Sequence, residues 1–154
     1  MDKPFFIYLV HPMSGLKWEE VEEYYTRSKK DLEALGYFVL HPMCAKSELK
    51  GNRFDPRAGE SINPVVSPHG ITRRDHWMVR KADIIFADLS GAKKKSIGSI
   101  SEVAAGYIQG KHTVGVMEAD NIHRHAFMEE QVDVLFETYE GAIDYLAKLI
   151  QGRY

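Results

Sequence analysis

One stretch of the sequence combines carboxylates, hydroxyls and glycines at a spacing that could do chemistry. It runs from Asp83 to Tyr107 and contains an apolar segment, a polar turn and then a segment with helical spacing that carries Glu102. A carboxylate in the first turn of a helix that follows a buried strand would face the crevice above a sheet, where it could attack an electrophilic carbon. The same spacing has a structural interpretation, because Ser99 followed three residues later by Glu102 matches a capping box. From spacing alone, the structural interpretation is the more frequent one.

Polar groups just before this glutamate form a candidate anion site. Ser96, Gly98 and Ser99 offer hydroxyl and backbone N–H groups at the expected start of a helix, where anions bind readily. The three lysines at 93–95 add positive charge, although such a run is more often a solvated loop than a direct phosphate contact.

Asp75 and Tyr8 are further candidates, each with a structural alternative. Asp75 lies between arginines and a histidine (73–76), which taken alone indicates a carboxylate on a helix surface. Tyr8 lies in an apolar run, where it is equally well interpreted as a buried strand tyrosine with a satisfied hydroxyl. Spacing alone decides neither case.

The sequence lacks the motifs of several common binding and catalytic sites. No glycine fingerprint for dinucleotides follows the first apolar run, and no phosphate-cradling Walker loop occurs. The histidines at 69, 76, 123 and 125 do not have the spacing of a zinc site, and Cys44 has no evident activating partner. We therefore expect no metal and no cofactor.

The elements that must position these residues alternate between strands and helices. Short apolar runs predict strands at 5–10, 37–40, 82–89, 113–117 and 132–136, and helical periodicity predicts helices at 16–35, 71–81, 98–109 and 139–150. This order predicts an α/β fold: one Rossmann-like (flavodoxin-like) domain over 1–154, with about five parallel strands and helices on both faces. The segment 43–69 has no clear period, and a connection of that length is expected to cover the substrate.

Composition excludes several other classes of protein. The 154 residues are 44% hydrophobic and 27% charged, with a formal net charge of −2, which argues against disorder and against a protein that mainly neutralises nucleic acid. No apolar run approaches the ~20 residues of a membrane span. A single cysteine and no secretory leader at the N-terminus indicate a reducing cytoplasm.

Four motifs together resemble one enzyme family. They are Ile7-Tyr8 followed by a Pro-Met-Ser-Gly turn, an Asp eight residues before Asp83, the strand Ala-Asp-Ile-Ile-Phe-Ala-Asp-Leu-Ser, and Ser-x-Gly-Ser-x-x-Glu with Gly-Tyr beyond. From Ile7 to about Met117 the chain resembles the nucleoside 2-deoxyribosyltransferase superfamily, which also contains 2′-deoxynucleoside 5′-monophosphate N-glycosidases. The resemblance implies an enzyme that cleaves an N-glycosidic bond without a cofactor.

The resemblance also implies roles for individual residues. Glu102 matches the family nucleophile, Asp75 the acid that passes a proton to the departing base, and Tyr8 the residue that orients the nucleophile. Ser96, Gly98 and Ser99 would hold the 5′ end of the sugar. Substrate contacts are also expected from the residues after the first strand, after the third strand and near the C-terminal third, namely His11, Ser14, Gly15, Asp88, Ser90 and His125.

Substrate class and reaction stay open at this point. Ser96 matches the nucleotide-hydrolysing branch and favours a nucleotide. Against this, Pro12 and Ser14 replace the Ser and Arg that this branch places on the phosphate. A His-Arg-His run at 123–125 could meet a phosphate from a neighbouring subunit. The first hypothesis is a deoxyribosyltransferase, with the 5′-monophosphate hydrolase as the alternative. Rival hypotheses are a nucleotide-sensing module without turnover and a purely structural interaction domain. Family members complete their site across subunits, so a homodimer or larger assembly is expected.

Overall fold

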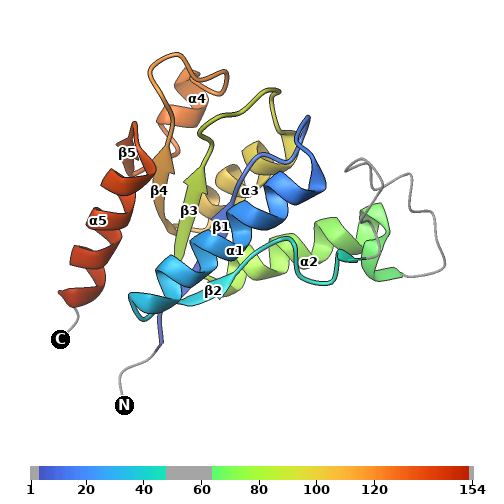
Figure 1. The fold of residues 1–154 in the computed structure, drawn as a ribbon, viewed down its shortest axis with the longest axis horizontal. Helices are drawn as coiled ribbons and strands as arrows, with labels where there is room; N and C mark the ends of the chain where they lie inside the picture. Colours follow the sequence, from blue (N-terminus) through green and yellow to red (C-terminus); the bar gives the residue numbers. More distant parts are fainter. Residues whose placement is uncertain (1–3, 48–63, 153–154) are drawn as a thin grey trace.

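The computed structural model describes residues 4–47 and 64–152. Its elements follow in the order β1 (Phe6–Val10), α1 (Trp18–Ala34), β2 (Phe38–Leu40), the 3₁₀ turn η3 (Pro64–Val66), α2 (Pro68–Lys81), β3 (Ile84–Asp88), α3 (Ile97–Ile108), β4 (His112–Val116), α4 (Ala126–Glu129), β5 (Val134–Phe136) and α5 (Tyr139–Gln151). Strands and helices alternate along the chain, as the sequence predicts (Figure 1).

The five strands form one parallel sheet in the order β2-β1-β3-β4-β5. The expected α/β class and the parallel sheet are therefore confirmed. The chain leaves β1 towards one edge of the sheet and later leaves β3 towards the other edge. Strand order reverses between β1 and β3, and ligands of open α/β sheets bind outside the carboxyl ends of the strands at such a point.

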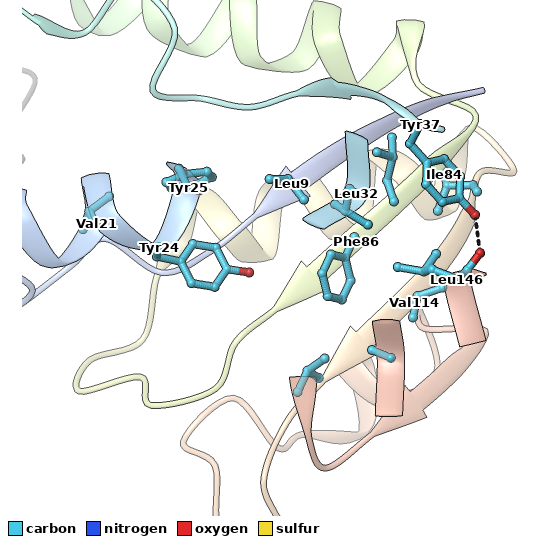
Figure 2. Packing of buried hydrophobic residues seen from close by; sticks show 13 residues of the cluster. Leu9, Val21, Tyr24, Tyr25, Leu32, Tyr37, Ile84, Phe86, Val114 and Leu146 are labelled. Carbon is cyan, nitrogen blue, oxygen red and sulfur yellow. Dashed lines mark hydrogen bonds between the residues drawn. The ribbon is translucent and has the colours of Figure 1, made fainter. Parts of the chain in front are cut away.

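Helices cover both faces of the sheet, because alternate strand residues point to opposite sides. Residues of α1 and α5 pack with Ile7, Leu9 and Phe86 on one face, and residues of α2 and α3 pack with Tyr8 and Ile85 on the other. Figure 2 shows the first of these two clusters, in which the Tyr37 hydroxyl donates to the carbonyl of Leu146 at 2.8 Å and ties α5 to the start of β2.

Local boundaries differ from the predictions in ways that have simple causes. Helix α2 begins at Pro68 rather than at residue 71, because the Ser67 side chain caps it by accepting the N–H of Gly70 and proline suits the first helical position. The predicted capping box of Ser99 and Glu102 is wrong. The residue that caps α3 is Ser96, which places Glu102 in the second turn of the helix rather than the first.

The predicted covering segment 43–69 is described only in part, since residues 48–63 lie outside the described ranges. Over the described ranges, no helix is long and apolar enough to cross a membrane, and no group of three or more His, Cys, Asp or Glu side chains is placed to hold a metal ion.

Candidate active site

A cavity of about 230 Å³ opens at the carboxyl ends of β1, β2 and β3, where the strand order reverses. Its lining comes from four separate segments of the chain: the turn after β1, the segment after β2, helix α2, and helix α3 with its N-cap. The lining residues are His11, Met13, Ser14, Pro42, Lys46, Ile71, Asp75, Ser96, Gly98, Ser99 and Glu102. Seven of the residues singled out from sequence are in this group.

Close packing of α3 against the sheet brings Glu102 to the cavity. A Cβ atom on Gly106 would lie 2.7 Å from Cγ1 of Ile85, so only glycine allows α3 to approach β3 this closely one turn after Glu102. The Glu102 side chain is 8% exposed, and its Oε1 accepts a 2.9 Å hydrogen bond from the hydroxyl of Tyr8. Tyr8 lies within β1, fully buried beneath the cavity rather than at the end of the strand.

Burial and charge change the acidity of Glu102. Desolvation, together with the nearby charge of Asp75, raises the pKa of Glu102 to about 8, while the Tyr8 hydrogen bond and the Lys46 ammonium act in the opposite direction. The carboxyl is therefore largely protonated at neutral pH in the free protein. A strongly shifted carboxyl in a cavity is typical of functional sites.

Asp75 is buried and paired, not exposed on the helix surface. Its Oδ2 lies 3.2 Å from Nζ of Lys46, and its Oδ1 accepts bonds from Nε and Nη2 of Arg74 at 3.3 and 3.2 Å. Both Asp75 and Lys46 are almost fully buried, at 6% and 5% exposure. The cavity lining thus brings together a carboxyl from α2, a carboxyl from α3 and the buried ammonium of Lys46 from the segment after β2.

A chain of hydrogen bonds fixes the loop before α3. The hydroxyl oxygen of Ser96 accepts the N–H of Ser99 at 3.3 Å and the Ser99 hydroxyl at 2.9 Å. Because the Ser96 oxygen is the acceptor in both bonds, its own hydrogen remains available to a ligand in the cavity. The N–H of Ser96 donates to Nε2 of His123 at 2.9 Å.

His123 is a buried, neutral acceptor and not a cationic phosphate ligand. Its Nε2 accepts a backbone N–H, so the ring hydrogen is on Nδ1, which lies 3.3 Å from Oδ1 of Asn121. The Asn121 amide is oriented in turn, since its Nδ2 donates to the carbonyl of Leu89 and to Glu118. Burial and the charge of Lys95 lower the pKa of His123, which keeps the ring neutral.

Four predicted substrate contacts do not line the cavity. Asp88 is buried, and its Oδ1 accepts the N–H and hydroxyl of Ser90. Gly15 adopts φ +83°, so it serves the turn after β1. His125 caps α4 by accepting the N–H of Phe127 and lines a separate cavity of about 210 Å³. The roles predicted for these four residues therefore stay predictions.

Sequence reasoning missed Lys46, Arg74 as a partner of Asp75, and the pair Asn121 and His123. Lys46 lies six residues after the last residue of β2, so its closeness to the carboxyl end of a strand was a usable signal. No short-range pattern links Lys46 to Asp75, which is 29 residues away, or His123 to Ser96, which is 27 residues away. These contacts arise from the topology of the sheet.

The fold and the cavity define a single-domain α/β protein with paired carboxyls at the topological switch point. No protein-family model matches the sequence, and no curated protein does so either. Among solved structures, the chain is similar to a 2-deoxyribosyltransferase from Bacillus psychrosaccharolyticus, with a TM-score of 0.64 and 21% identity over 91% of each chain. It is also similar to a CMP N-glycosidase from Clostridium botulinum, with a TM-score of 0.55 and 16% identity over 94% of this chain and 96% of the other.

Both of these proteins are enzymes of the nucleoside 2-deoxyribosyltransferase superfamily, which is the family that the sequence motifs resemble. At these identities the similarity establishes the fold of the chain. One solved enzyme is a transferase and the other a hydrolase of an N-glycosidic bond.

Proposed function

We propose that this protein is an enzyme that cleaves the N-glycosidic bond of a 2′-deoxynucleoside, or of its 5′-monophosphate, through a covalent glycosyl ester on Glu102. The observation that carries the proposal is the hydrogen bond of 2.9 Å between Tyr8 and Glu102 in a cavity that also holds Asp75 and Lys46. Burying a carboxyl so that its pKa rises to about 8 reduces the stability of the folded protein. Such a cost is typical of groups that take part in catalysis.

In the first step, a carboxylate oxygen of Glu102 attacks the anomeric carbon of the deoxyribose. The C1′–N bond breaks, its electron pair goes to the nitrogen of the base, and that nitrogen receives a proton from Asp75. The Tyr8 hydroxyl holds Glu102 in position for the attack. The transition state has oxocarbenium character, as in retaining glycosidases, and the absence of a 2′-hydroxyl makes this cation easier to form.

The proton for the leaving base comes from the pair of carboxyls itself. Near neutral pH the raised pKa of Glu102 places one proton on that side chain, while Asp75 is ion-paired with Lys46 and Arg74. Transfer of this proton from Glu102 to Asp75 creates the nucleophile and the acid at the same time. Two interacting carboxyls that share one proton are a recurrent solution in acid–base catalysis.

In the second step, a new acceptor attacks the anomeric carbon and the ester bond to Glu102 breaks, which restores the carboxylate. The acceptor is a second base in a transferase or water in a hydrolase, and its proton returns to Asp75. We place the transferase first and the 5′-monophosphate hydrolase second.

We further propose a cytoplasmic homodimer or larger assembly. Three exposed apolar side chains are available for such an interface: Tyr107 and Ile108 at the end of α3, and Phe127 on α4.

The test is release of free base, resolved by chromatography. Wild type and Glu102→Gln are incubated with each deoxynucleoside and each deoxynucleoside 5′-monophosphate, with and without a second base. Gln keeps the shape and an acceptor for Tyr8 but cannot form the ester, so turnover should fall by about 10³-fold or more. Glu33→Gln is a matched control, because Glu33 lies on α1 outside the cavity and pairs with Lys29 on the same helix.

Each outcome assigns a function. Base exchange that requires the second base identifies a transferase, and release from monophosphates without an acceptor identifies a hydrolase. If wild type binds nucleosides without releasing base, the protein is the nucleotide sensor that the sequence left as a rival. If it neither binds nor cleaves any compound, the interaction domain takes its place.

A further inference from the structure

The orientation of the His11 imidazole is fixed by a bond to the main chain. Its Nδ1 lies 2.8 Å from the carbonyl oxygen of Asp88, at the end of the neighbouring strand β3. A carbonyl oxygen can only accept, so the hydrogen of the neutral ring is on Nδ1. Nε2 therefore carries a lone pair and can only accept a hydrogen bond.

Aromatic side chains from α1 prevent the ring from turning. Tyr24 stacks on it with centroids 3.5 Å apart and an interplanar angle of 8°, and Tyr25 meets it edge-on at 6.2 Å. The Tyr25 hydroxyl also donates to the main-chain oxygen of His11 at 3.4 Å. His11 thus reaches the cavity from the α1 face of the sheet, whereas Tyr8 and Glu102 belong to the face covered by α2 and α3.

The surroundings of the ring favour its neutral form. Burial lowers the pKa of His11, and Arg27 acts in the same direction, against the opposing effect of Asp88. Nε2 has no hydrogen-bond partner within residues 4–47 and 64–152, although the ring is only 9% exposed and lines the cavity. A phosphate dianion offers no hydrogen to such an acceptor, whereas a hydroxyl group does.

We propose that His11 is a specificity-determining residue whose Nε2 accepts a hydrogen bond from a deoxyribose hydroxyl of the substrate. This inference rests on the proposed function, because it takes the ligand in the cavity to be a deoxynucleoside. Two hydroxyls of the sugar, at the 3′ and the 5′ positions, have the required chemistry. The Ser96 hydroxyl, which is free to donate, can serve the other one.

The experiment removes the hydroxyl from the substrate and the acceptor from the protein. Base release is measured for a 2′-deoxynucleoside, the 2′,3′-dideoxynucleoside and the 2′,5′-dideoxynucleoside, with wild type, His11→Phe and His11→Gln. Phe retains a ring to stack on Tyr24 but has no acceptor, and Gln retains an acceptor oxygen. His41→Phe is the matched control, because His41 also follows a strand and stacks near Tyr25 but does not line this cavity.

We expect wild type to lose about tenfold in kcat/KM on the analogue that lacks the hydroxyl bound by His11. A loss on the other analogue, whose hydroxyl Ser96 can bind, should persist in His11→Phe, so the analogue whose loss disappears in that variant identifies the hydroxyl. His11→Phe should lose activity on the parent substrate and treat that analogue and the parent alike, and His11→Gln should restore part of the preference. His41→Phe should keep the wild-type preference. Equal losses on each analogue in wild type and His11→Phe would overturn the proposal, since a purely structural His11 affects all substrates in the same proportion.

A second measurement separates failure of this proposal from failure of the proposed function. The Nε2 resonance of His11 is followed by ¹H–¹⁵N NMR in Glu102→Gln as the deoxynucleoside or either analogue is added. A shift with the deoxynucleoside that is absent with one analogue supports the hydroxyl contact even if no compound is turned over. No shift of this resonance with a deoxynucleoside that moves other resonances of the protein rejects the contact, whereas no shift of any resonance means that nothing binds and rejects the proposed function together with the inference that rests on it.

Discussion

The cavity has two linings that differ in how they hold charge. The charged lining consists of Lys46, Asp75 and Glu102, together with Tyr8 beneath them, and the neutral lining consists of His11, Ser96 and Ser99, together with His123, which accepts the N–H of Ser96 from outside the cavity. In the charged lining, buried carboxyls face an ammonium and a guanidinium, and the pKa of Glu102 is raised to about 8. In the neutral lining, both histidines are uncharged acceptors whose tautomers are fixed by main-chain groups.

This difference separates two tasks that a single site must perform. Groups that exchange a proton or form a bond need shifted pKa values, and these come from burial beside other charges. Groups that only position a ligand work best when they do not titrate near neutral pH. We therefore expect substitutions in the charged lining to alter kcat and the pH profile, and substitutions in the neutral lining to alter KM at an unchanged pH profile.

The largest expected effect after loss of Glu102 is that of Asp75→Asn. Loss of the proton shuttle should lower kcat by about 10²- to 10⁴-fold. Wild-type kcat/KM should fall as the pH rises above about 8, where the pair of carboxyls loses its shared proton. Removing the charge of Asp75 lowers the pKa of Glu102 and removes the acid, so this alkaline decrease should disappear.

Profiles of kcat/KM against pH check this prediction. Asp83→Asn is the control, because Asp83 accepts the N–H of Phe6 at the opposite end of the sheet. We call the decrease in kcat/KM above about pH 8 the alkaline limb of the profile. If Asp75→Asn keeps the wild-type alkaline limb, the limb reports the titration of another group.

A smaller effect is expected for Tyr8→Phe. The Tyr8 hydroxyl favours the ionised form of Glu102, so its removal raises the pKa of that carboxyl and makes the nucleophile rarer. We expect kcat/KM to fall about tenfold at neutral pH and the alkaline limb to move to higher pH.

The matched control is Tyr37→Phe, which removes another buried tyrosine hydroxyl whose partner is the carbonyl of Leu146. It should lower the unfolding temperature while the pH profile keeps its position. If the pH profiles of Tyr8→Phe and Tyr37→Phe superimpose, the Tyr8 hydroxyl does not influence the pKa of Glu102.

The smallest effect belongs to the neutral lining. His123→Phe leaves the buried N–H of Ser96 without its acceptor, and the loop before α3 should lose its fixed position. We expect KM to rise about threefold to tenfold, with kcat changed less and the alkaline limb in place. His125→Phe, which removes the side-chain cap of α4 outside this cavity, should leave both constants near wild type. A shift of the alkaline limb in His123→Phe would contradict the separation of the two linings.

Much of the fold could be predicted from the sequence because its signals are local. The continuous apolar runs and the helical periodicities predict five strands and four long helices, and the structure contains them with boundaries moved by a few residues. The short helix α4 and the turn η3 have too few residues for a period and were not predicted. Spacing predicts a cap of α3 at Ser99, whereas the structure has it at Ser96, because both serines precede a helical pattern and spacing does not distinguish them.

The candidate site could be predicted only in part, for a related reason. Motifs indicated Glu102, Asp75 and Tyr8, because each lies at a characteristic distance along the chain from another motif residue. Lys46 and His123 are absent from those motifs, and their partners lie 27 or more residues away. Gly106 was visible as a glycine in a helix, but only the contact with Ile85 shows why it is needed.

By itself, the sequence determined the class of fold, the order of the strands along the chain and the identity of the residues that could do chemistry, since these follow from periodicity and residue type. Tertiary structure decided which of those residues meet at the point between β1 and β3, which histidines stay neutral, and how far the pKa of Glu102 is raised. The physical reason is that burial and electrostatic interaction depend on distances through space, and these arise only when segments far apart in the chain pack together.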